Sequence, residues 1–129
     1  MKLRILNLAL ALAAATAFMS ASAFAAGDAA KGKKVFNKCR ACHTLEAGKD
    51  RIGPSLHGII GRPAGSVESF QSKYSDAMKN SGVTWTEENL DHYLTKPKDF
   101  IPGNKMQFVG LRKEDDRQDV IAYLKENAM

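Results

Sequence analysis

The chain has 129 residues, which is enough for one domain and too few for a multidomain enzyme. It carries 19 basic and 14 acidic residues, and its formal charge of +5 falls to +3 once Lys2 and Arg4 of the N-terminal segment are set aside. This mild excess, without a motif that interleaves basic and aromatic residues, does not predict binding to nucleic acid.

The N-terminal segment has the pattern of a signal peptide. A basic start precedes a Leu- and Ala-rich run over 5–18, and Ala23-Phe24-Ala25 places small residues at the two positions that a signal peptidase reads. We predict cleavage after Ala25, so that 1–25 is a signal peptide and 26–129 is the exported domain. The alternative is an uncleaved anchor, because 5–26 is nearly long enough to span a bilayer. No later stretch is apolar enough for stable membrane insertion.

A first helix is predicted from Asp28, which can cap it, to about Lys38. One face of this helix carries residues at the spacing i, i+3, i+4 and i+7, namely Gly32, Val35, Phe36 and Cys39. Glycine weakens a helix, so we interpret Gly32 as the place where another helix approaches closely.

Directly after this helix comes the motif Cys39-Arg40-Ala41-Cys42-His43, which contains the only two cysteines of the chain. This C-x-x-C-H pattern is the attachment signature of a c-type haem. The two sulfurs can add to the vinyl groups of the ring, and the histidine then lies within reach of the iron.

Other readings of the cysteines are less consistent with the sequence. A thioredoxin-like motif requires a βαβ setting, and no alternation of strands and helices is predicted. A structural zinc site needs four ligands, and His57 and His92 do not have finger-like spacing. A disulfide between these cysteines would close only a small, strained loop.

From residue 44 to residue 65 the periodicity is lost, and glycine and proline are frequent. We interpret this stretch as loops that wrap around a cofactor, since a long irregular segment is otherwise unusual in a compact domain. A short helix follows over Ser75–Ser81, capped by Ser75. Thr86 is predicted to cap a third helix that ends at Pro97 and packs through Leu90, Tyr93 and Leu94.

After an irregular segment over 100–110, a last helix is predicted to start with a capping box of Asp115 and Gln118. Its packing side consists of Val120, Ile121, Tyr123 and Leu124. The predicted fold class of the exported domain is all-α, with few helices and wrapping loops around one covalently bound haem.

An iron bound through His43 has a second axial position to fill. Met106 is the favoured candidate, because it follows an irregular Pro-Gly-Asn-Lys segment that can reach the far face of the ring. Met78, in a short helix, is the other methionine of the domain interior. His57, His92 or an open sixth position remain alternatives, and an open position would indicate a peroxidase-like or gas-binding protein.

Taken together, these motifs resemble class I cytochromes c, most closely the short bacterial cytochrome c2 type related to the mitochondrial protein. The resemblance covers nearly all of 27–127. In order, its blocks are Gly27-Asp-Ala-Ala-Lys-Gly-Lys-Lys-Val-Phe36, Cys39-Arg-Ala-Cys-His43, Gly53-Pro-Ser-Leu-His-Gly58, Tyr74-Ser-Asp-Ala77, Gly82-Val-Thr-Trp85, Tyr93-Leu-Thr-Lys-Pro97, Ile101-Pro-Gly-Asn-Lys-Met106 and Val120-Ile-Ala-Tyr-Leu124. The chain has Asn104 where the mitochondrial protein has threonine, and one residue fewer between Phe36 and Cys39.

The resemblance implies a role for each matching residue. Cys39 and Cys42 would form the thioethers of a single haem c, and His43 would ligate its iron, oriented by the carbonyl of Pro54. Met106 would be the distal ligand, with the Tyr93 hydroxyl near its sulfur. The haem propionates would be bound or compensated by Trp85, Tyr74, Asn104 and Arg62. Gly32 and Phe36 would meet Val120 and Tyr123 where the first and last helices cross.

The implied function is that of a soluble, monomeric, periplasmic one-electron carrier rather than an enzyme. Its partners would be a membrane donor such as a bc1-type complex and an acceptor such as a cytochrome oxidase, a reaction centre, or a periplasmic reductase or dehydrogenase. The resemblance places basic residues around the exposed haem edge, where they would dock on acidic surfaces: Lys38, Lys98, Lys105, Arg112 and Lys113.

Overall fold

The computed structural model describes residues 14–16 and 26–129, so Ala25, after which cleavage is predicted, lies outside the described residues, as do residues 1–13 and 17–24 of the predicted signal peptide. The described chain forms α1 (Ala29–Phe36), the 3-10 helix η1 (Glu68–Phe70), α2 (Asp76–Lys79), α3 (Glu87–Thr95), α4 (Pro97–Phe100) and α5 (Glu114–Asn127). Pro63 and Thr84 make an isolated antiparallel bridge, and the described part contains no strand. The predicted all-α class is confirmed.

Helix α1 begins where the sequence predicts and ends earlier. The Asp28 carboxylate accepts hydrogen bonds from the backbone N–H groups of Ala30 and Lys31, at 2.9 and 3.2 Å. The helix stops at Phe36 because the chain then tightens into turns, with Cys39 N donating to Phe36 O at 2.8 Å. These turns, and not a further helical turn, carry the first cysteine.

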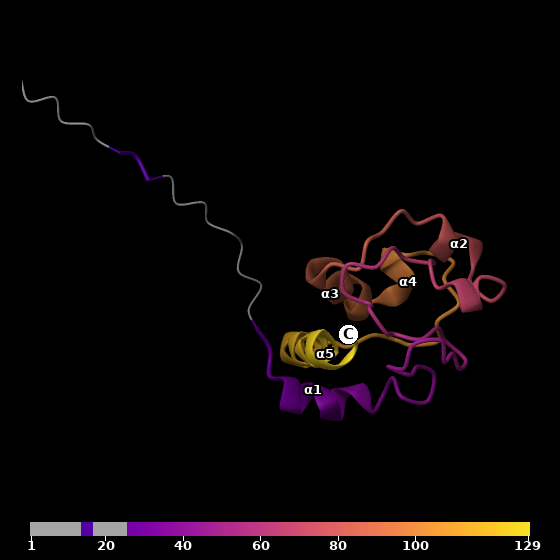
Figure 1. Ribbon diagram of the computed structural model, residues 1–129, viewed down its shortest axis with the longest axis horizontal. Coiled ribbons are helices and arrows are strands. Elements are labelled where there is room, and N and C mark those ends of the chain that lie inside the picture. The colour runs from indigo at the N-terminus through magenta and orange to yellow at the C-terminus, as the bar shows by residue number, and fades with distance from the viewer. Residues whose placement is uncertain (1–13, 17–25) are drawn as a thin grey trace, which may run out of the picture.

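Helices α1 and α5 cross in close contact, and α3 lies on the other side of α5 (Figure 1). Gly32 and Phe36 are the buried residues of α1. The Phe36 ring packs on Tyr123 with 5.3 Å between ring centroids. A Cβ on Gly32 would collide with the backbone carbonyl of Asp119 and lie 2.8 Å from the Cβ of Tyr123. The predicted crossing is confirmed, and Gly32 is the residue that allows it.

Replacement of Gly32 by alanine is expected to lower the free energy of unfolding by about 1–3 kcal/mol, because the added methyl group overpacks the crossing. The gain in helix propensity, about 1 kcal/mol, does not offset a clash with backbone. Denaturant unfolding of the haem-loaded protein measures the change. Lys33→Ala, at an exposed position of the same helix, is the matched control and should stay within about 0.5 kcal/mol of the parent. Equal stability of Gly32→Ala and the parent would contradict the close crossing.

The caps of α2 and α3 are those predicted. The Ser75 hydroxyl accepts from Met78 N at 3.0 Å, and the Thr86 hydroxyl accepts from Asn89 N at 3.1 Å. Pro97 ends α3 as expected but also starts α4, because proline lacks an N–H and its fixed φ suits the first turn of a helix. No pattern in the sequence predicts α4 or η1.

The predicted capping box of the last helix is wrong. Helix α5 starts at Glu114, its N-cap residue Lys113 makes no side-chain capping bond, and Asp115 is already inside the first turn. Gln118 donates instead to the Glu114 carboxylate at 2.9 Å, one turn earlier on the helix. Three successive carboxylates in the first turn favour this start, because they interact well with the positive end of the helix dipole.

The core lies between α1, α3 and α5 and extends under the loops. Its fully or nearly buried members include Phe36, Ile59, Trp85, Leu90, Val120 and Ile121. In residues 14–16 and 26–129, no helix has the length and apolar character that crossing a bilayer would need.

Candidate functional site

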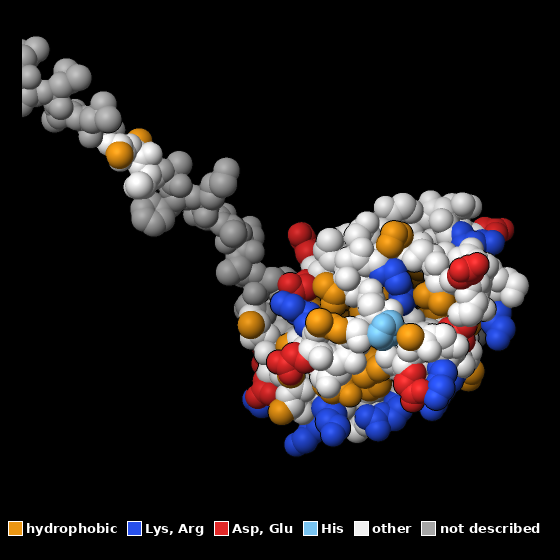
Figure 2. Space-filling view, viewed as in Figure 1, with side chains coloured by type: hydrophobic (Ala, Val, Ile, Leu, Met, Phe, Trp, Pro, Cys, Tyr) orange, Lys and Arg blue, Asp and Glu red, His pale blue; other side chains and the backbone are white. Residues whose placement is uncertain are grey.

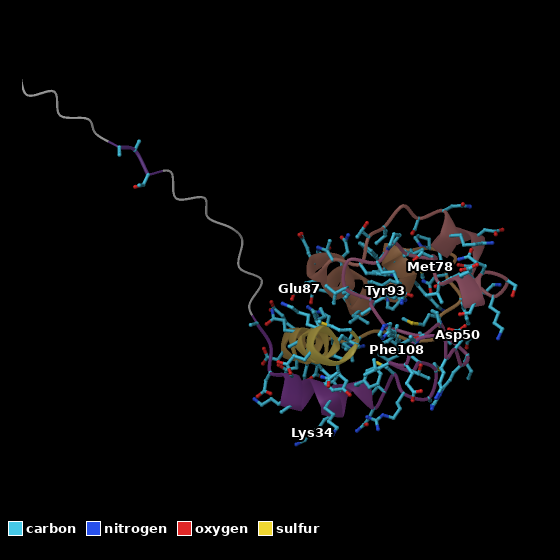
Figure 3. The ribbon with its side chains drawn as sticks, viewed as in Figure 1. Lys34, Asp50, Met78, Glu87, Tyr93 and Phe108 are labelled. Atoms are coloured by element: carbon cyan, nitrogen blue, oxygen red, sulfur yellow. The ribbon has the colours of Figure 1, made fainter. Side chains whose placement is uncertain are left out.

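A cavity of about 380 Å³ opens inside the wrapping loops, within the range of about 300–1,000 Å³ that is typical of cofactor sites. Segments far apart in the sequence line it. In Figure 3 the side chains of Met78, Tyr93 and Phe108 lie around this interior. The lining also includes Phe36, Cys39, Cys42, His43, Pro54, Leu56, Ile59, Arg62, Phe70, Tyr74, Trp85, Leu90, Leu94, Met106, Val120 and Leu124.

The cysteine turn brings both thiols to one end of this cavity. The backbone N–H groups of Cys42 and His43 both donate to Cys39 O, at 3.1 and 2.9 Å, so the five residues of the motif form one compact turn. Both cysteines are free thiols and both line the cavity. Burial raises the pKa of Cys39 to about 11, and the neighbouring Cys42 adds to the rise. Cys39 is therefore a protonated thiol at neutral pH.

The imidazole of His43 is held in a defined orientation. Its Nδ1 lies 2.7 Å from the carbonyl oxygen of Pro54, which accepts the N–H and leaves Nε2 as the basic nitrogen. Burial lowers the pKa of His43, so the ring is neutral at neutral pH. Gly53 lies directly against the ring, and a Cβ there would come within 2.8 Å of Nδ1. A neutral, oriented imidazole is the form that binds a metal.

Met106 lies at the cavity within a small polar network. The Tyr93 hydroxyl is 3.7 Å from the Met106 sulfur and 3.5 Å from Asn104 Oδ1. Asn104 Oδ1 also accepts the backbone N–H of Met106 at 2.9 Å. Burial raises the pKa of Tyr93, so its hydroxyl keeps its proton and can donate it.

The expectation that Asn104 donates to a propionate is not supported by its contacts. Both amide hydrogens are already used, on Pro97 O at 2.9 Å and on Ile101 O at 2.8 Å. Since an asparagine amide has only two hydrogens, none remains for another acceptor. Asn104 instead ties together the turn that precedes Met106.

Arg62, Trp85 and Tyr74 lie together at the polar side of the cavity. Trp85 N donates to Arg62 O at 2.9 Å, next to the Pro63–Thr84 bridge, so a short backbone pairing joins two of the predicted propionate residues. Trp85 also packs on Tyr93, with ring centroids 4.9 Å apart. Burial raises the pKa of Tyr74, and its hydroxyl accepts from Val67 N at 3.3 Å.

The guanidinium of Arg62 is only partly satisfied. Nη1 donates to the carbonyls of Ser55 and His57, at 2.9 and 2.8 Å. Nε is buried and has no hydrogen-bond partner among the described residues. Burial lowers the pKa of Arg62, but arginine stays charged. A buried, charged N–H without a partner marks a place where an anion would be stabilised.

The five basic residues assigned to docking are all exposed, and in the described part of the chain none of them forms an ion pair. Lys38 and Lys105 line the cavity, whereas Lys98, Arg112 and Lys113 do not. Figure 2 shows basic side chains along the lower edge of the molecule, over α1.

The structure adds residues that the sequence analysis did not single out. Lys73 and Ile52 line the cavity, and Ile52 is 80% exposed, so it is an apolar residue at the opening. Asp50 accepts from Ser55 N at 2.8 Å and fixes the loop after the cysteine turn. No periodicity or motif marks these positions in the sequence, because loop residues become neighbours only through tertiary contacts.

The residues at this cavity fit a haem. They offer two thiols, an imidazole and a thioether sulfur, the groups that attach and ligate haem iron, among mainly apolar side chains. Arg62 lines the cavity and offers a positive charge to one of the ring's carboxylates.

Comparisons with known proteins agree with this fit. The cytochrome c family profile matches residues 29–128. A cytochrome c2 of Rhodomicrobium vannielii is 50% identical over 116 residues, 89% of this chain and 91% of that protein. A cytochrome c2 of Blastochloris viridis is 50% identical over 103 residues, 79% of this chain and 80% of that protein. The structure of cytochrome cH from Methylobacterium extorquens superposes with a TM-score of 0.72 at 44% identity, covering 78% of this chain and 99% of that one.

The fold and the cavity thus define a small helical haem protein. The chain belongs to the cytochrome c family, in class I with the bacterial c2-type proteins. It carries one covalently attached haem c with its iron, and it is an electron carrier.

Proposed function

We propose that this chain is a periplasmic one-electron shuttle whose haem is attached through Cys39 and Cys42 and ligated by His43 and Met106. The observation that carries the proposal is that these four residues, from segments more than sixty positions apart in the sequence, line one cavity. The haem iron supplies the one-electron chemistry when bound, and a methionine ligand raises its reduction potential.

The residues of the chain hold the group and keep its surroundings constant. Pro54 orients His43, and Tyr93 and Asn104 position the sulfur of Met106. Arg62, with Trp85 and Tyr74 beside it, compensates a propionate. Because these contacts are fixed by buried side chains and backbone, little rearrangement accompanies a change of one charge at the iron. Small rearrangement favours fast electron exchange and fits a carrier better than an enzyme.

The exported state is part of the proposal. The N-terminal pattern supports a signal peptide that is removed after Ala25 to leave a monomeric domain from residue 26. An oxidising compartment such as the periplasm favours disulfides, but two cysteines this close would close only a small, strained loop, so thioether attachment to a haem uses them better.

We propose that the exposed cations steer the carrier onto acidic surfaces of its partners, a bc1-type complex as donor and an oxidase, reaction centre, reductase or dehydrogenase as acceptor. Lys38, Lys73 and Lys105 are exposed residues of the cavity lining, as is Ile52. Lys98, Arg112 and Lys113 are further exposed cations, and none of them has an acidic partner within the described structure. Such a surface gives fast, weak and salt-sensitive association.

The test is the rate of reduction by a purified bc1-type complex at two ionic strengths. Raising the salt from about 0.01 M to about 0.15 M shortens the screening length from roughly 30 Å to roughly 8 Å, so the rate should fall about tenfold or more. The Lys38→Glu/Lys105→Glu variant should be slow even at low salt. Lys31→Glu/Lys33→Glu, with the same charge change at exposed positions that do not line the cavity, is the control. A reduction rate that does not depend on salt, or an equal decrease of the rate in both double variants, would contradict the docking role.

A further inference from the structure

The segment that carries Met106 has few backbone contacts. Asn104 N donates to Ile101 O at 3.1 Å, and the next residue along the chain with such a bond is Leu111, whose N–H donates to Leu94 O at 2.7 Å. Between them, residues 105–110 make no backbone-to-backbone hydrogen bond within the described structure. Val109 is 90% exposed, whereas Met106 and Phe108 are partly buried and pack against the core. Apart from this packing, the position of Met106 depends on how residues 104 and 111 are held.

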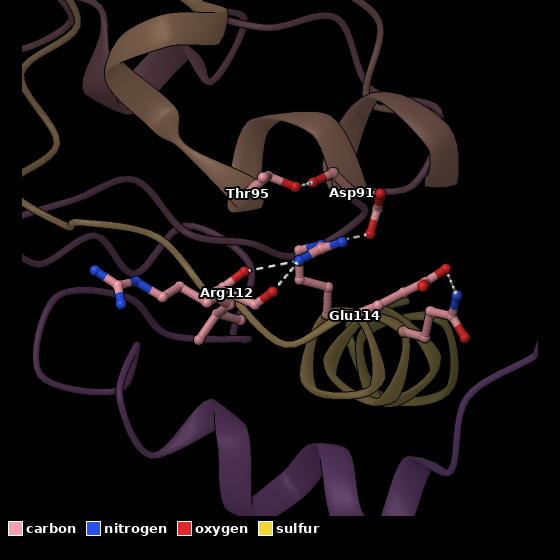
Figure 4. A network of polar contacts seen from close by, with 7 residues as sticks. Asp91, Thr95, Arg112 and Glu114 are labelled. Carbon is pink, nitrogen blue, oxygen red and sulfur yellow. Dashed lines mark hydrogen bonds and ion pairs between the residues drawn. The ribbon is translucent and has the colours of Figure 1, made fainter.

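At residue 104 the segment is held by the Asn104 side chain, which donates to the carbonyl oxygens of Pro97 and Ile101. The second end is held from α5. Arg117 Nη1 donates to the carbonyl oxygens of Leu111 and Arg112, at 2.9 and 3.0 Å, and Nε donates to the carboxylate of Asp91 on α3 at 2.8 Å (Figure 4). One guanidinium thus joins the end of the segment, α3 and α5.

This junction is largely removed from solvent. The side chains of Arg117 and Asp91 are 11% and 19% exposed, unlike the other ion pairs of the described chain, whose partners are all more than 30% exposed. Charge-assisted hydrogen bonds are stronger in such surroundings, and the planar fork of arginine can serve three acceptors at once. A Cβ on Gly110 would collide with the carbonyl of Thr95, so the segment also lies tightly on the end of α3 here.

We infer that Arg117 is a positioning residue for Met106. By holding the Leu111 and Arg112 carbonyls against α3, it keeps the 105–110 segment in the arrangement that places the Met106 sulfur at the cavity. Arg117 does not itself line the cavity, so it acts through the segment alone. The inference rests on the proposed function, in which Met106 ligates the iron.

The test uses the oxidised, haem-loaded protein and the variant Arg117→Lys. Lysine keeps the charge but cannot bond both carbonyls and Asp91 in one plane. Imidazole is titrated while the long-wavelength band typical of methionine bound to Fe(III) is followed. The affinity of imidazole, measured by the displacement of Met106, should be about tenfold to a hundredfold higher in the variant than in the parent. Amide hydrogen exchange at Leu111 should become faster in the variant.

Lys125→Gln is the matched control, because it breaks the other ion pair between α5 and α3, Lys125 Nζ to Glu87 Oε1 at 3.1 Å, and touches no carbonyl of the segment. It should leave imidazole affinity unchanged even where it lowers the thermal midpoint. If Arg117→Lys does not fold, Asp91→Asn serves instead and should change the affinity in the same direction by a smaller factor. If the Arg117 or Asp91 variant binds imidazole with the same affinity as the parent, the positioning role of Arg117 is overturned, and the proposed ligation by Met106 is not affected. Absence of the methionine band in the parent would overturn the ligation proposal and the inference with it.

Discussion

Replacement of both Cys39 and Cys42 by serine is expected to abolish covalent haem attachment and, with it, most of the folded structure. Serine hydroxyls do not add to the haem vinyl groups as thiols do. Mass spectrometry of material made in a host that matures c-type haem proteins should show the bare polypeptide mass for the double variant. The far-ultraviolet circular dichroism should show strongly reduced helix content.

The expected structural effect follows from the cavity. Without the ring, the cavity of about 380 Å³ would be open to water, and the mainly apolar side chains that line it would lose the packing that buries them. A single replacement, Cys42→Ser, keeps one attachment point and is the control, with an intermediate effect expected. A double variant that keeps the haem mass, or that keeps parental helix content without it, would contradict the proposed role of the cysteines.

Replacement of Met106 by leucine is expected to change the iron environment while leaving the fold in place. Leucine has nearly the volume of methionine, so the cost in stability should stay below about 1.5 kcal/mol, but it has no sulfur to donate. The long-wavelength absorption band of the oxidised protein should disappear, and the reduction potential should fall, because the methionine ligand stabilises the reduced iron. Cyanide should then bind rapidly at the position that Met106 occupied.

Met78→Leu is the matched control for this experiment. Met78 also lines the cavity and is partly buried, so the same substitution there perturbs the same space without touching the proposed ligand. The Met78→Leu variant should keep the long-wavelength band, the reduction potential and the slow reaction with cyanide of the parent. Loss of the band in Met78→Leu with retention in Met106→Leu would reverse the assignment. Rapid cyanide or peroxide reaction of the unaltered protein would instead favour an open sixth position and the peroxidase-like or gas-binding alternative.

Local chemistry alone predicted several features well. The caps formed by Asp28, Ser75 and Thr86 depend on side chains that bond to their own neighbouring backbone, so the sequence contains all the information needed. A close helix approach at Gly32 was predicted from a glycine within an apolar helical face, whereas its partners on the last helix were predicted only from the resemblance to class I cytochromes c. The position of the last helix was predicted, but its first residue was not, since Glu114 and Asp115 are both plausible starts.

The contacts of Asn104 show what the sequence could not provide. The side-chain amide of Asn104, which lies between Pro-Gly and Lys-Met, has several possible hydrogen-bond acceptors. Only the folded chain shows that it donates to the carbonyl oxygens of Pro97 and Ile101. Arg117 was not predicted at all, because its partners Asp91 and Leu111 are brought to it by the packing of α3 on α5.

The sequence by itself determined the cysteine–histidine motif, the helical class and the identity of the groups offered to the haem, since these depend on residue type and short spacing. Only the tertiary structure decided which of those groups share one cavity, that Arg62 keeps a buried N–H without a partner, and how the Met106 segment is held at its two ends. The physical reason is that burial and long-range hydrogen bonds join residues tens of positions apart, and no local pattern records which of them will meet.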